Sequence, residues 1–413
     1  MDILRFLTAG SVDDGKSTLI GRLLYDSKNI LIDQMEALER SSKNREDGSV
    51  DLALLTDGLR AEREQGITID VAYKYFSTPK RKFIIADAPG HIQYTRNMVT
   101  GASNSDLIII LIDARNGVIE QTKRHSIIAS LLNIPYVVVA INKMDLVDYS
   151  ESRYNEIVGQ YQQVAKQLGL KNITYIPISA LNGDNIVDTS ENINWYNGNT
   201  LLNLLETIEL QSSTNLVNGR FPVQLVLRPQ TDDLHDYRGY AGRIESGIFR
   251  KGDKVKVYPS GISATIASVE INNKEVMEAF APQSAVLHLE EDVDVSRGDV
   301  IAKEDSLLKV SQEMEAIVCW MDDKPMSVRN RYLLQHNTKL VPVMVKSIDH
   351  KLDVNTLEQQ TGVAQANLNE VVKVQLKTAS PLAYDSYQQI RTNGGAILID
   401  ETSFVTVGAV LFV

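Results

Sequence analysis

The sequence of 413 residues contains a single cysteine, Cys319, so the chain cannot form an internal disulfide. This absence excludes the small disulfide-stabilised scaffolds of secreted proteins and favours a reducing, cytoplasmic environment. Cys319 lies in the apolar run 316–320, which predicts a buried structural thiol rather than a nucleophile.

The chain also lacks long apolar runs and a net positive charge. No stretch of about 18 consecutive apolar residues occurs, and the short apolar run at the N-terminus leads directly into a polar loop. We therefore expect neither a membrane span nor a signal peptide. The formal net charge is −11, whereas proteins that coat nucleic acid usually carry a basic surface. Nucleic acid is therefore not the expected main partner.

The strongest pattern in the chain is an eight-residue loop that matches G-x-x-x-x-G-K-[ST], the phosphate-binding loop. It comprises Gly10, Ser11, Val12, Asp13, Asp14, Gly15, Lys16 and Ser17. The two glycines allow successive backbone N–H groups to face an anion, and Lys16 is expected to reach the β- and γ-phosphates. The hydroxyl of Ser17 is a hard oxygen ligand suited to Mg²⁺. A strand before the loop and a helix after it place the phosphates at a helix N-terminus.

Residues 1–211 alternate between short apolar runs and amphipathic segments. Buried strands are predicted at 3–9, 82–87, 107–113, 136–142 and 174–179, and helices at 121–132, 153–168 and 201–210. Strands separated by helices form a mostly parallel sheet with helices on both faces. Residues 71–77 instead alternate and precede Thr78-Pro79-Lys80, which predicts an antiparallel hairpin at the sheet edge.

The rest of the chain is rich in short strands separated by Gly, Pro and Asp turns. At about 150 residues a domain, the length predicts two or three domains. The strands are expected at 221–228, 239–245, 254–258, 265–271 and 285–289, then from 313 and at 338–348, 370–376, 396–399 and 404–413. This spacing predicts two small β-barrels. The predicted domains are 1–211, an α/β P-loop domain, followed by barrels over 216–304 and 308–413.

Four further stretches supply the remaining parts of a nucleotide site. Asp87, Ala88, Pro89, Gly90 and His91 follow a strand, where an aspartate commonly holds Mg²⁺ and a glycine N–H meets the γ-phosphate. Upstream, Thr68 lies in 62–70 and offers a hydroxyl as a second Mg²⁺ ligand in a segment ordered by the γ-phosphate. Taken alone, 62–70 is better interpreted as a charged helix end before a strand.

Two short motifs specify the base. Asn142, Lys143, Met144 and Asp145 close one strand, and a carboxylate at Asp145 can accept both the N1–H and the 2-amino group of guanine. Adenine lacks this pair of donors, so Asp145 predicts GTP over ATP. Ser179, Ala180 and Leu181 close the next strand, which places the Ala180 N–H to meet guanine O6. Each motif alone could be a loop cap, but five elements in order predict binding of Mg²⁺ and GTP.

These five elements resemble the translation-factor class of GTPases, and the two barrels resemble domains 2 and 3 of elongation factor Tu. The resemblance covers the whole chain. It implies that His91 orients the attacking water, that Val12 and Ile67 form a hydrophobic gate beside it, and that Asp13 matches a position linked to a monovalent cation. The catalytic assignment of His91 depends on this resemblance.

Within the class, residues 56–73, 81–87, 91–98 and 140–150 are very similar to the large, GTP-hydrolysing subunit of bacterial sulfate adenylyltransferase. Residues 195–202 and 237–242 also fit, and 353–357 and 393–396 agree more loosely. Asp14 stands where elongation factors usually carry histidine, which favours this branch. Ala88 replaces a commoner threonine, with little effect expected because that position contacts phosphate through its backbone.

The resemblance implies a heteromeric, cytoplasmic enzyme that forms adenylyl sulfate and pyrophosphate from ATP and sulfate. A smaller, ATP-pyrophosphatase-like subunit would carry out the transfer, and GTP hydrolysis by this chain would drive it. The alternatives are a translation elongation factor that delivers aminoacyl-tRNA, and a GTP-binding scaffold without useful turnover. Three other features are expected to be structural: the acidic stretches 232–236 and 290–294, and His125 as a surface or packing residue on a helix.

Overall fold

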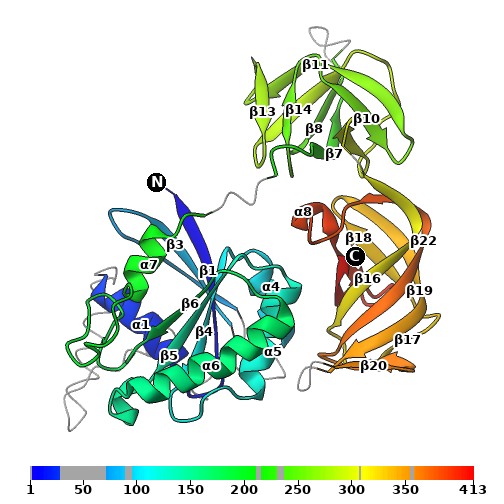
Figure 1. The fold of residues 1–413 in the computed structure, drawn as a ribbon. Helices are drawn as coiled ribbons and strands as arrows, with labels where there is room; N and C mark the ends of the chain where they lie inside the picture. The colour runs from blue at the N-terminus through cyan, green and yellow to red at the C-terminus, as the bar shows by residue number, and fades with distance from the viewer. Residues whose placement is uncertain are drawn as a thin grey trace. The chain divides into compact units, whose positions relative to one another are not determined.

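The computed structural model describes residues 2–27, 71–88, 95–210, 215–229, 237–306, 308–353 and 358–413. The chain divides into two compact units, the first over Met1–Leu210 and the second over Gln211–Asp353 and Glu358–Val413 (Figure 1). No helix in the described part of the chain is long and apolar enough to cross a membrane.

The first unit is built on a six-stranded sheet in the order β2-β3-β1-β4-β5-β6. The strands are β1 Ile3–Ala9, β2 Ala72–Ser77, β3 Lys82–Asp87, β4 Leu107–Asp113, β5 Tyr136–Asn142 and β6 Ile173–Pro177. Strand β2 pairs antiparallel with β3 at the sheet edge, and the other neighbours are parallel. The predicted mostly parallel sheet and its edge hairpin are therefore confirmed.

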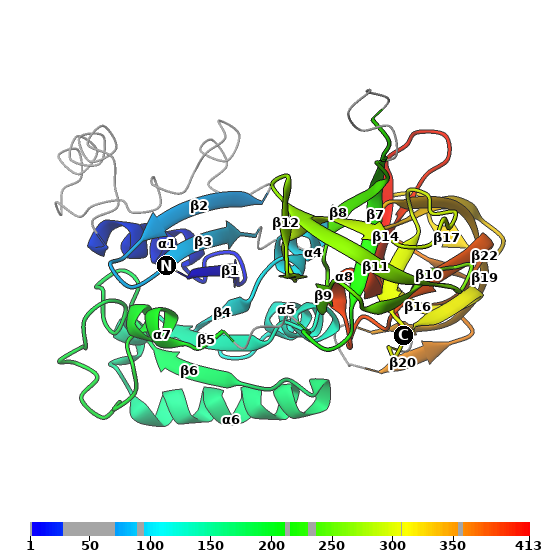
Figure 2. The same cartoon turned by 90° about the horizontal axis from the view of Figure 1, so that it is seen from above.

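Helices cover both faces of this sheet (Figures 1 and 2). They are α1 Lys16–Asp26, α4 Thr95–Ser103, α5 Glu120–Leu131, α6 Glu151–Leu168 and α7 Leu201–Thr207, with a 3-10 turn over Met144–Val147. Leucines and isoleucines of α1 and α7 share one core with alternate residues of the strands, such as Phe6, Ile109 and Leu111. Because neighbouring side chains of a strand point to opposite faces, the remaining buried strand residues face α4 and α5.

The second unit consists of two closed β-barrels, as predicted. In the first, a seven-stranded sheet is closed by pairing of β10 with β11, and in the second β18 pairs with β19. The strands of the first barrel are β7 Arg220–Leu227, β8 Gly239–Arg243, β9 Ile248–Arg250, β10 Lys254–Tyr258, β11 Ile262–Ile271, β12 Lys274–Val276, β13 Glu278–Phe280, β14 Ser284–Leu289 and β15 Val300–Lys303. The second barrel has β16 Lys309–Trp320, β17 Met326–Ser327, β18 Arg331–His336, β19 Lys339–Leu352, β20 Gln359–Thr361, β21 Gln365–Ala366, β22 Val371–Tyr384, β23 Gly395–Ile399 and β24 Thr406–Phe412, with α8 over Arg391–Gly394.

A buried ion pair joins the two barrels. The guanidinium of Arg220 on β7 donates to both carboxylate oxygens of Asp385 at 2.8 and 2.9 Å, and both side chains are almost fully buried. Ser306 accepts a third hydrogen bond from Arg220, and the Asn393 amide donates to Asp385. Removing one partner of a buried charge pair is strongly destabilising, so each of these two side chains is expected to be needed at this contact. The boundary that we predict between them, at 304–308, stays a prediction.

Several local expectations differ from the structure. Helix α7 ends at Thr207 rather than Leu210, and the Arg81 guanidinium donates to the carbonyls of Leu205 and Ile208, which terminates the helix there. Short strands such as β9, β12 and β13 carry too few residues for a period-2 pattern to predict them. Cys319 is 6% exposed, and burial raises the pKa of its thiol to about 12, as expected for a structural cysteine.

Candidate functional site

The phosphate-binding loop lies between the end of β1 and the start of α1. Gly15 has φ +91°, and a Cβ atom there would come within 2.5 Å of the Asn142 amide nitrogen. A Cβ on Gly10 would meet the Leu111 side chain at 3.1 Å. The loop therefore needs Gly15 for both its backbone angle and its close approach to Asn142, while Gly10 is needed for space. The residues predicted for this loop, 10–17, are all in the described part of the chain.

Lys16 is held at the point where the loop meets β3. Its side chain is buried, and its Nζ donates a hydrogen bond of 2.8 Å to the carbonyl of Ala88. Burial lowers the pKa of Lys16, while the charges of Asp87 and Asp14 oppose this effect. The ammonium is thus pre-positioned beside the loop, where a phosphate would replace the neutral carbonyl with a charged acceptor.

The predicted magnesium ligands that the structure describes are Ser17 and Asp87. Ser17 is in the first turn of α1, and Asp87 is the last residue of β3, 2% exposed, with one oxygen accepting from the Thr8 hydroxyl at 3.2 Å. A hydroxyl and a carboxylate are hard oxygen donors, which fit Mg²⁺. Within the described residues no cluster of three or more His, Cys, Asp and Glu side chains forms a separate metal site. The donor set therefore suits an ion that is held jointly with phosphate oxygens rather than by protein alone.

Asn142 connects the phosphate-binding loop to the base-recognition loops. Its amide nitrogen donates to the Asp14 carbonyl at 2.7 Å, and its Oδ1 accepts the Ala180 N–H at 2.9 Å. Lys143 extends the connection, since its Nζ donates to the Asp13 carbonyl and pairs with Asp113 at 2.9 Å. The Ala180 N–H that we predicted for guanine O6 is thus already engaged, and a base contact would have to share it.

Asp145 lies in the 3-10 turn that follows β5. Its Oδ1 is buried and forms no hydrogen bond in the described part of the structure. Met144, directly before it, is fully buried and anchors the turn. A buried carboxylate oxygen without a hydrogen bond is costly, and in native proteins such a group calls for an explanation. A ligand with two adjacent N–H donors, as guanine has, would satisfy it.

Asp14 is the most perturbed acidic group of the loop. Its Oδ2 accepts the Ser11 N–H at 2.5 Å, and the side chain is buried. Burial raises the pKa of Asp14 from 3.8 to about 6, with Asp113 acting in the same direction and with the Ser11 N–H, Lys143 and Lys16 opposing it. A carboxyl group whose pKa is higher in the folded than in the unfolded chain lowers stability progressively as the pH rises from the unfolded to the folded value, and the full cost is present above the folded value.

We therefore expect Asp14→Asn to stabilise the nucleotide-free first unit at pH 8, by up to about 3 kcal/mol. The difference in unfolding free energy between the variant and the wild type should shrink as the pH falls below 6, because the wild-type carboxyl then becomes protonated in the folded state. Urea unfolding, with hydrogen exchange of the β4 amides to isolate the first unit, measures this from pH 8 to pH 5. Asp13→Asn, at an exposed neighbour, is the matched control. An equal difference at every pH would contradict the linkage.

Some predicted residues lie outside the described residues. These are Thr68, Pro89, Gly90 and His91 of the site, Ile67 of the gate, and the acidic stretch 232–236. Val12, the other gate residue, is 42% exposed at the loop. In the second acidic stretch, Glu291 accepts two hydrogen bonds from Thr265, so this exposed turn is fixed to β11.

The structure also brings in residues that sequence reasoning missed. Arg22 on α1 donates to the carbonyls of Ala180 and Leu181, and Asp113 at the end of β4 pairs with both Lys143 and Arg115. The sequence did carry a signal for Asp113, because a polar residue at the end of the apolar strand 107–113 is expected at the same sheet edge as the site. His125 is a buried packing residue, which is one of the two alternatives expected for it, and burial lowers its pKa to about 3, with the charges of Lys16 and Arg124 acting in the same direction.

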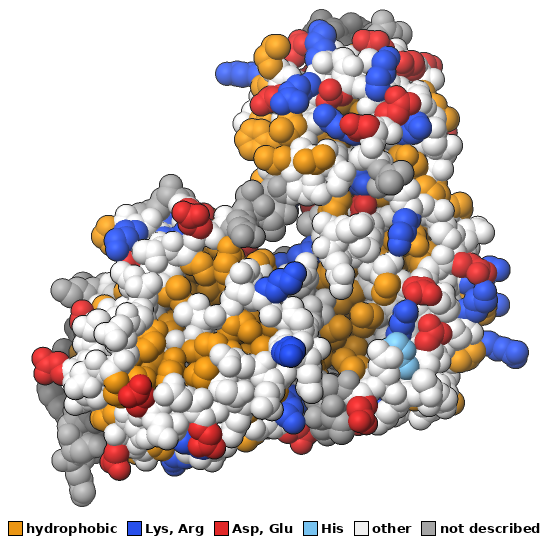
Figure 3. Space-filling model, viewed as in Figure 1, with side chains coloured by type: hydrophobic (Ala, Val, Ile, Leu, Met, Phe, Trp, Pro, Cys, Tyr) orange, Lys and Arg blue, Asp and Glu red, His pale blue; other side chains and the backbone are white. Residues whose placement is uncertain are grey.

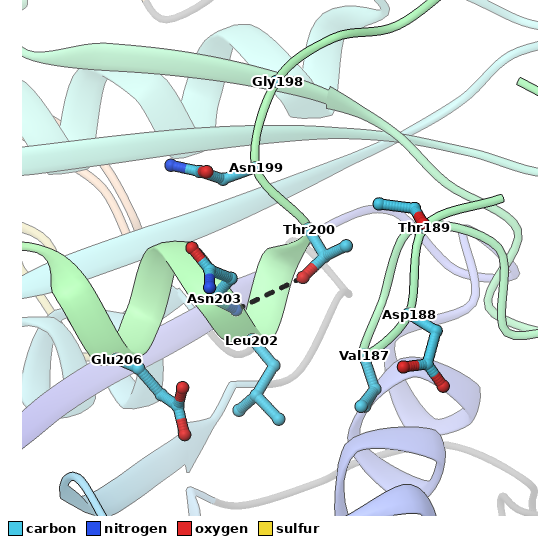
Figure 4. Close-up of a pocket in the computed structure, with 9 residues that line it drawn as sticks. All are labelled: Val187, Asp188, Thr189, Gly198, Asn199, Thr200, Leu202, Asn203 and Glu206. Carbon is cyan, nitrogen blue, oxygen red and sulfur yellow. Dashed lines mark hydrogen bonds between the residues drawn. The ribbon is translucent and has the colours of Figure 1, made fainter. Parts of the chain in front are cut away.

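A separate groove of about 440 Å³ lies beside α7 (Figure 4). It is lined by Val187, Asp188, Thr189, Gly198, Asn199, Thr200, Leu202, Asn203 and Glu206. In the close-up, Asp188 and Glu206 come from opposite walls, and the hydroxyl of Thr200 caps the helix by accepting the Asn203 N–H. The groove shares no residue with the predicted nucleotide site.

Comparisons with known proteins agree with this geometry. Residues 1–213 match the elongation factor Tu GTP binding domain, and residues 313–411 match the GTP-eEF1A C-terminal domain-like family. Sulfate adenylyltransferase subunit 1 of Bacteroides fragilis (strain YCH46) is 52% identical over 97% of this chain and 83% of its own length. The bifunctional enzyme CysN/CysC of Mycobacterium tuberculosis (strain ATCC 25618 / H37Rv) is 50% identical over 98% of this chain and 66% of its own length. A solved structure of sup35 complexed with GMPPNP is 23% identical, with a TM-score of 0.45, over all of this chain and 94% of that one.

Proposed function

The chain belongs to the sulfate adenylyltransferase subunit 1 family and carries an elongation factor Tu-type GTP binding domain, and we propose on this basis that it is the GTPase subunit of a sulfate adenylyltransferase. In this proposal a second subunit forms adenylyl sulfate and pyrophosphate from ATP and sulfate. That adenylylation is strongly uphill, and GTP hydrolysis on this chain drives it. The complex would operate in the cytoplasm.

The observation that carries the nucleotide part of the proposal is the buried Asp145 oxygen without a hydrogen bond. It lies in the turn next to Asn142, whose side chain reaches both the phosphate-binding loop and Ala180. Guanine between these loops would supply the donors that Asp145 lacks, while the triphosphate would lie along residues 10–17. This arrangement supports GTP rather than ATP as the nucleotide.

Three groups would act on the triphosphate. Lys16 would donate to the β- and γ-phosphates, and the backbone of 13–17 would present N–H groups to them. Ser17 and Asp87, with Thr68, would hold Mg²⁺, which would offset the charge of the phosphates. His91 would orient the attacking water, with Val12 and Ile67 beside it.

Coupling requires that the GTP and GDP forms of this chain differ in affinity for the partner or for its intermediate, because a ligand that binds both forms equally shifts nothing. The subunit 1 family name implies a partner subunit. We propose, from the family resemblance, that this partner is a small ATP-pyrophosphatase-like chain and that the present chain alone performs no adenylyl transfer.

Reconstitution tests the proposal. The chain is mixed with the small subunit, ATP and sulfate, and the yield of adenylyl sulfate is measured with and without GTP. The expected result is a yield that rises well above the GTP-free equilibrium as GTP is consumed. A yield that does not respond to GTP would reject the coupling.

An elongation factor that delivers aminoacyl-tRNA is less well supported. The net charge of −11 disfavours a large phosphate-binding surface, and acidic and basic side chains are interspersed on the face of the second unit shown in Figure 3. A salt-sensitive affinity for tRNA would favour this alternative. A scaffold without turnover would instead predict that His91→Ala leaves partner-stimulated GTP hydrolysis unchanged.

A further inference from the structure

Arg22 joins the helix of the phosphate-binding loop to the loop at 179–181. It lies on α1, and its Nε donates to the Ala180 carbonyl at 3.2 Å. One terminal nitrogen donates to the Leu181 carbonyl, and the other lies 3.6 Å from Asp26 one turn further along the helix. The planar guanidinium therefore bridges two consecutive carbonyls that are more than 150 residues away in sequence.

This bridge fixes the orientation of the peptide groups in the loop. The carbonyls of Ala180 and Leu181 both face α1, and in a planar trans peptide the N–H points opposite to the carbonyl. The Leu181 N–H must therefore point away from α1. From the other side, Asn142 Oδ1 accepts the Ala180 N–H at 2.9 Å. The loop is thus held between α1 and the first residue of the Asn142–Asp145 motif.

We propose that Arg22 is a positioning residue for guanine selection, which holds the Ala180–Leu181 peptide so that the Leu181 N–H meets the O6 atom of the base, beside the Ala180 N–H that Asn142 holds. The inference rests on the proposed guanine site. It assigns a role to a residue outside the motifs that contact the nucleotide, because Arg22 acts only through the loop.

The bridge also makes base recognition depend on the phosphate-binding helix. Arg22 is in the second turn of α1, the helix that begins at Lys16. A displacement of α1 would move the guanidinium and, with it, the carbonyls that it holds. Recognition of O6 and seating of the phosphates are therefore expected to reinforce each other, whereas recognition of the 2-amino group depends on Asp145, which Arg22 does not contact.

The test compares three base analogues bound to the full chain as diphosphates with Mg²⁺. GDP has O6, N1–H and the 2-amino group, IDP keeps O6 and N1–H but lacks the amino group, and 2-aminopurine riboside diphosphate keeps the amino group but lacks O6 and, with it, the N1–H. Each nucleotide is therefore compared between variant and wild type rather than with the other nucleotides. Affinities are measured by competition against a fluorescent GDP. In Arg22→Ala we expect GDP and IDP to weaken by the same factor, about tenfold, and the 2-aminopurine nucleotide to change by less than about twofold.

Two further variants keep the proposal falsifiable if Arg22→Ala does not fold. Arg22→Lys keeps a positive charge near Asp26 but replaces the planar fork, which donates from two separate nitrogens, by a single ammonium on a shorter side chain, so it should reproduce most of the loss for GDP and IDP. Asp26→Asn removes the ion pair and leaves the bridge, so it should bind all three nucleotides as the wild type does. Thermal unfolding of each variant checks that the fold is retained.

Different results of these binding experiments would contradict the role of Arg22 and the proposed guanine site. An equal loss for all three nucleotides, or no loss for any of them, would overturn the role of Arg22 in recognising O6. A wild-type chain that binds ADP as well as GDP would instead contradict the guanine site itself, and the inference would fall with it.

Discussion

Lys16→Ala is expected to lower GTP affinity and turnover together by about 100- to 1,000-fold. The side chain is buried beside the loop, with Nζ held by the Ala88 carbonyl at 2.8 Å, so the charge is already in place before the triphosphate arrives. Alanine removes the only side-chain ammonium of the loop motif and leaves its backbone N–H groups to carry the phosphate charge alone. Binding of fluorescent GTP and single-turnover hydrolysis measure the two losses.

Thermal unfolding of the variant separates this result from a loss of folding, because the Lys16 side chain is buried and its removal also takes away the hydrogen bond to Ala88. Lys82→Ala, at an exposed position on β3, removes a lysine of the same unit and should leave binding unchanged. A Lys16→Ala protein that binds GTP within a fewfold of the wild type would place the phosphates elsewhere.

Asp145→Asn is expected to exchange guanine for xanthine specificity. The carboxylate would accept from N1–H and the 2-amino group, whereas xanthine carries a carbonyl in place of that amino group. Asparagine offers an N–H donor to this carbonyl and loses the second acceptor for guanine. We expect GTP affinity to fall by about 100-fold or more, with XTP becoming the preferred nucleotide. Competition binding with GTP, XTP and ATP measures the exchange.

The matched control for this exchange is Asp148→Asn, which removes an exposed carboxylate three residues further along. It should keep the preference for GTP. Equal weakening of GTP and XTP in Asp145→Asn would show that the side chain supports the turn rather than contacts the base.

Local patterns in the sequence accounted for the elements that position the site. Strands β1, β3, β4 and β5 have the predicted bounds, because each is a mostly apolar run that ends at a polar residue or just before a glycine. The glycine–lysine–serine spacing located the phosphate-binding loop for a similar reason, since every residue that it needs is adjacent in sequence.

Long-range contacts could not be predicted in this way. The bridge from Arg22 to residues 180 and 181, and the two hydrogen bonds of Asn142, join segments that only the sheet order brings together. The same holds for Arg220 and Asp385, which are 165 positions apart. An arginine on a helix face has no periodic signal that distinguishes a solvent-exposed side chain from one that holds a distant loop.

The raised pKa of Asp14 could likewise not be predicted from the sequence. A carboxylate in a loop is usually solvated, and only the packing of the loop shows that this one is buried against Asp113 and bonded to Ser11. Asp14 also shares the loop with Lys16. Its ionisation is therefore a second electrostatic variable at the phosphate site, which the pH series on Asp14→Asn addresses.

The central claim is that the nucleotide bound to this chain drives chemistry on another. Adenylyl sulfate formation by the reconstituted complex that carries Asp145→Asn tests it most directly, because XTP then acts through this chain alone. The account predicts that XTP, and not GTP, raises the yield of adenylyl sulfate with this variant, whereas GTP raises it with the wild type. A variant complex that GTP still drives as well as the wild type, or that no nucleotide other than ATP affects in either form, would contradict the account.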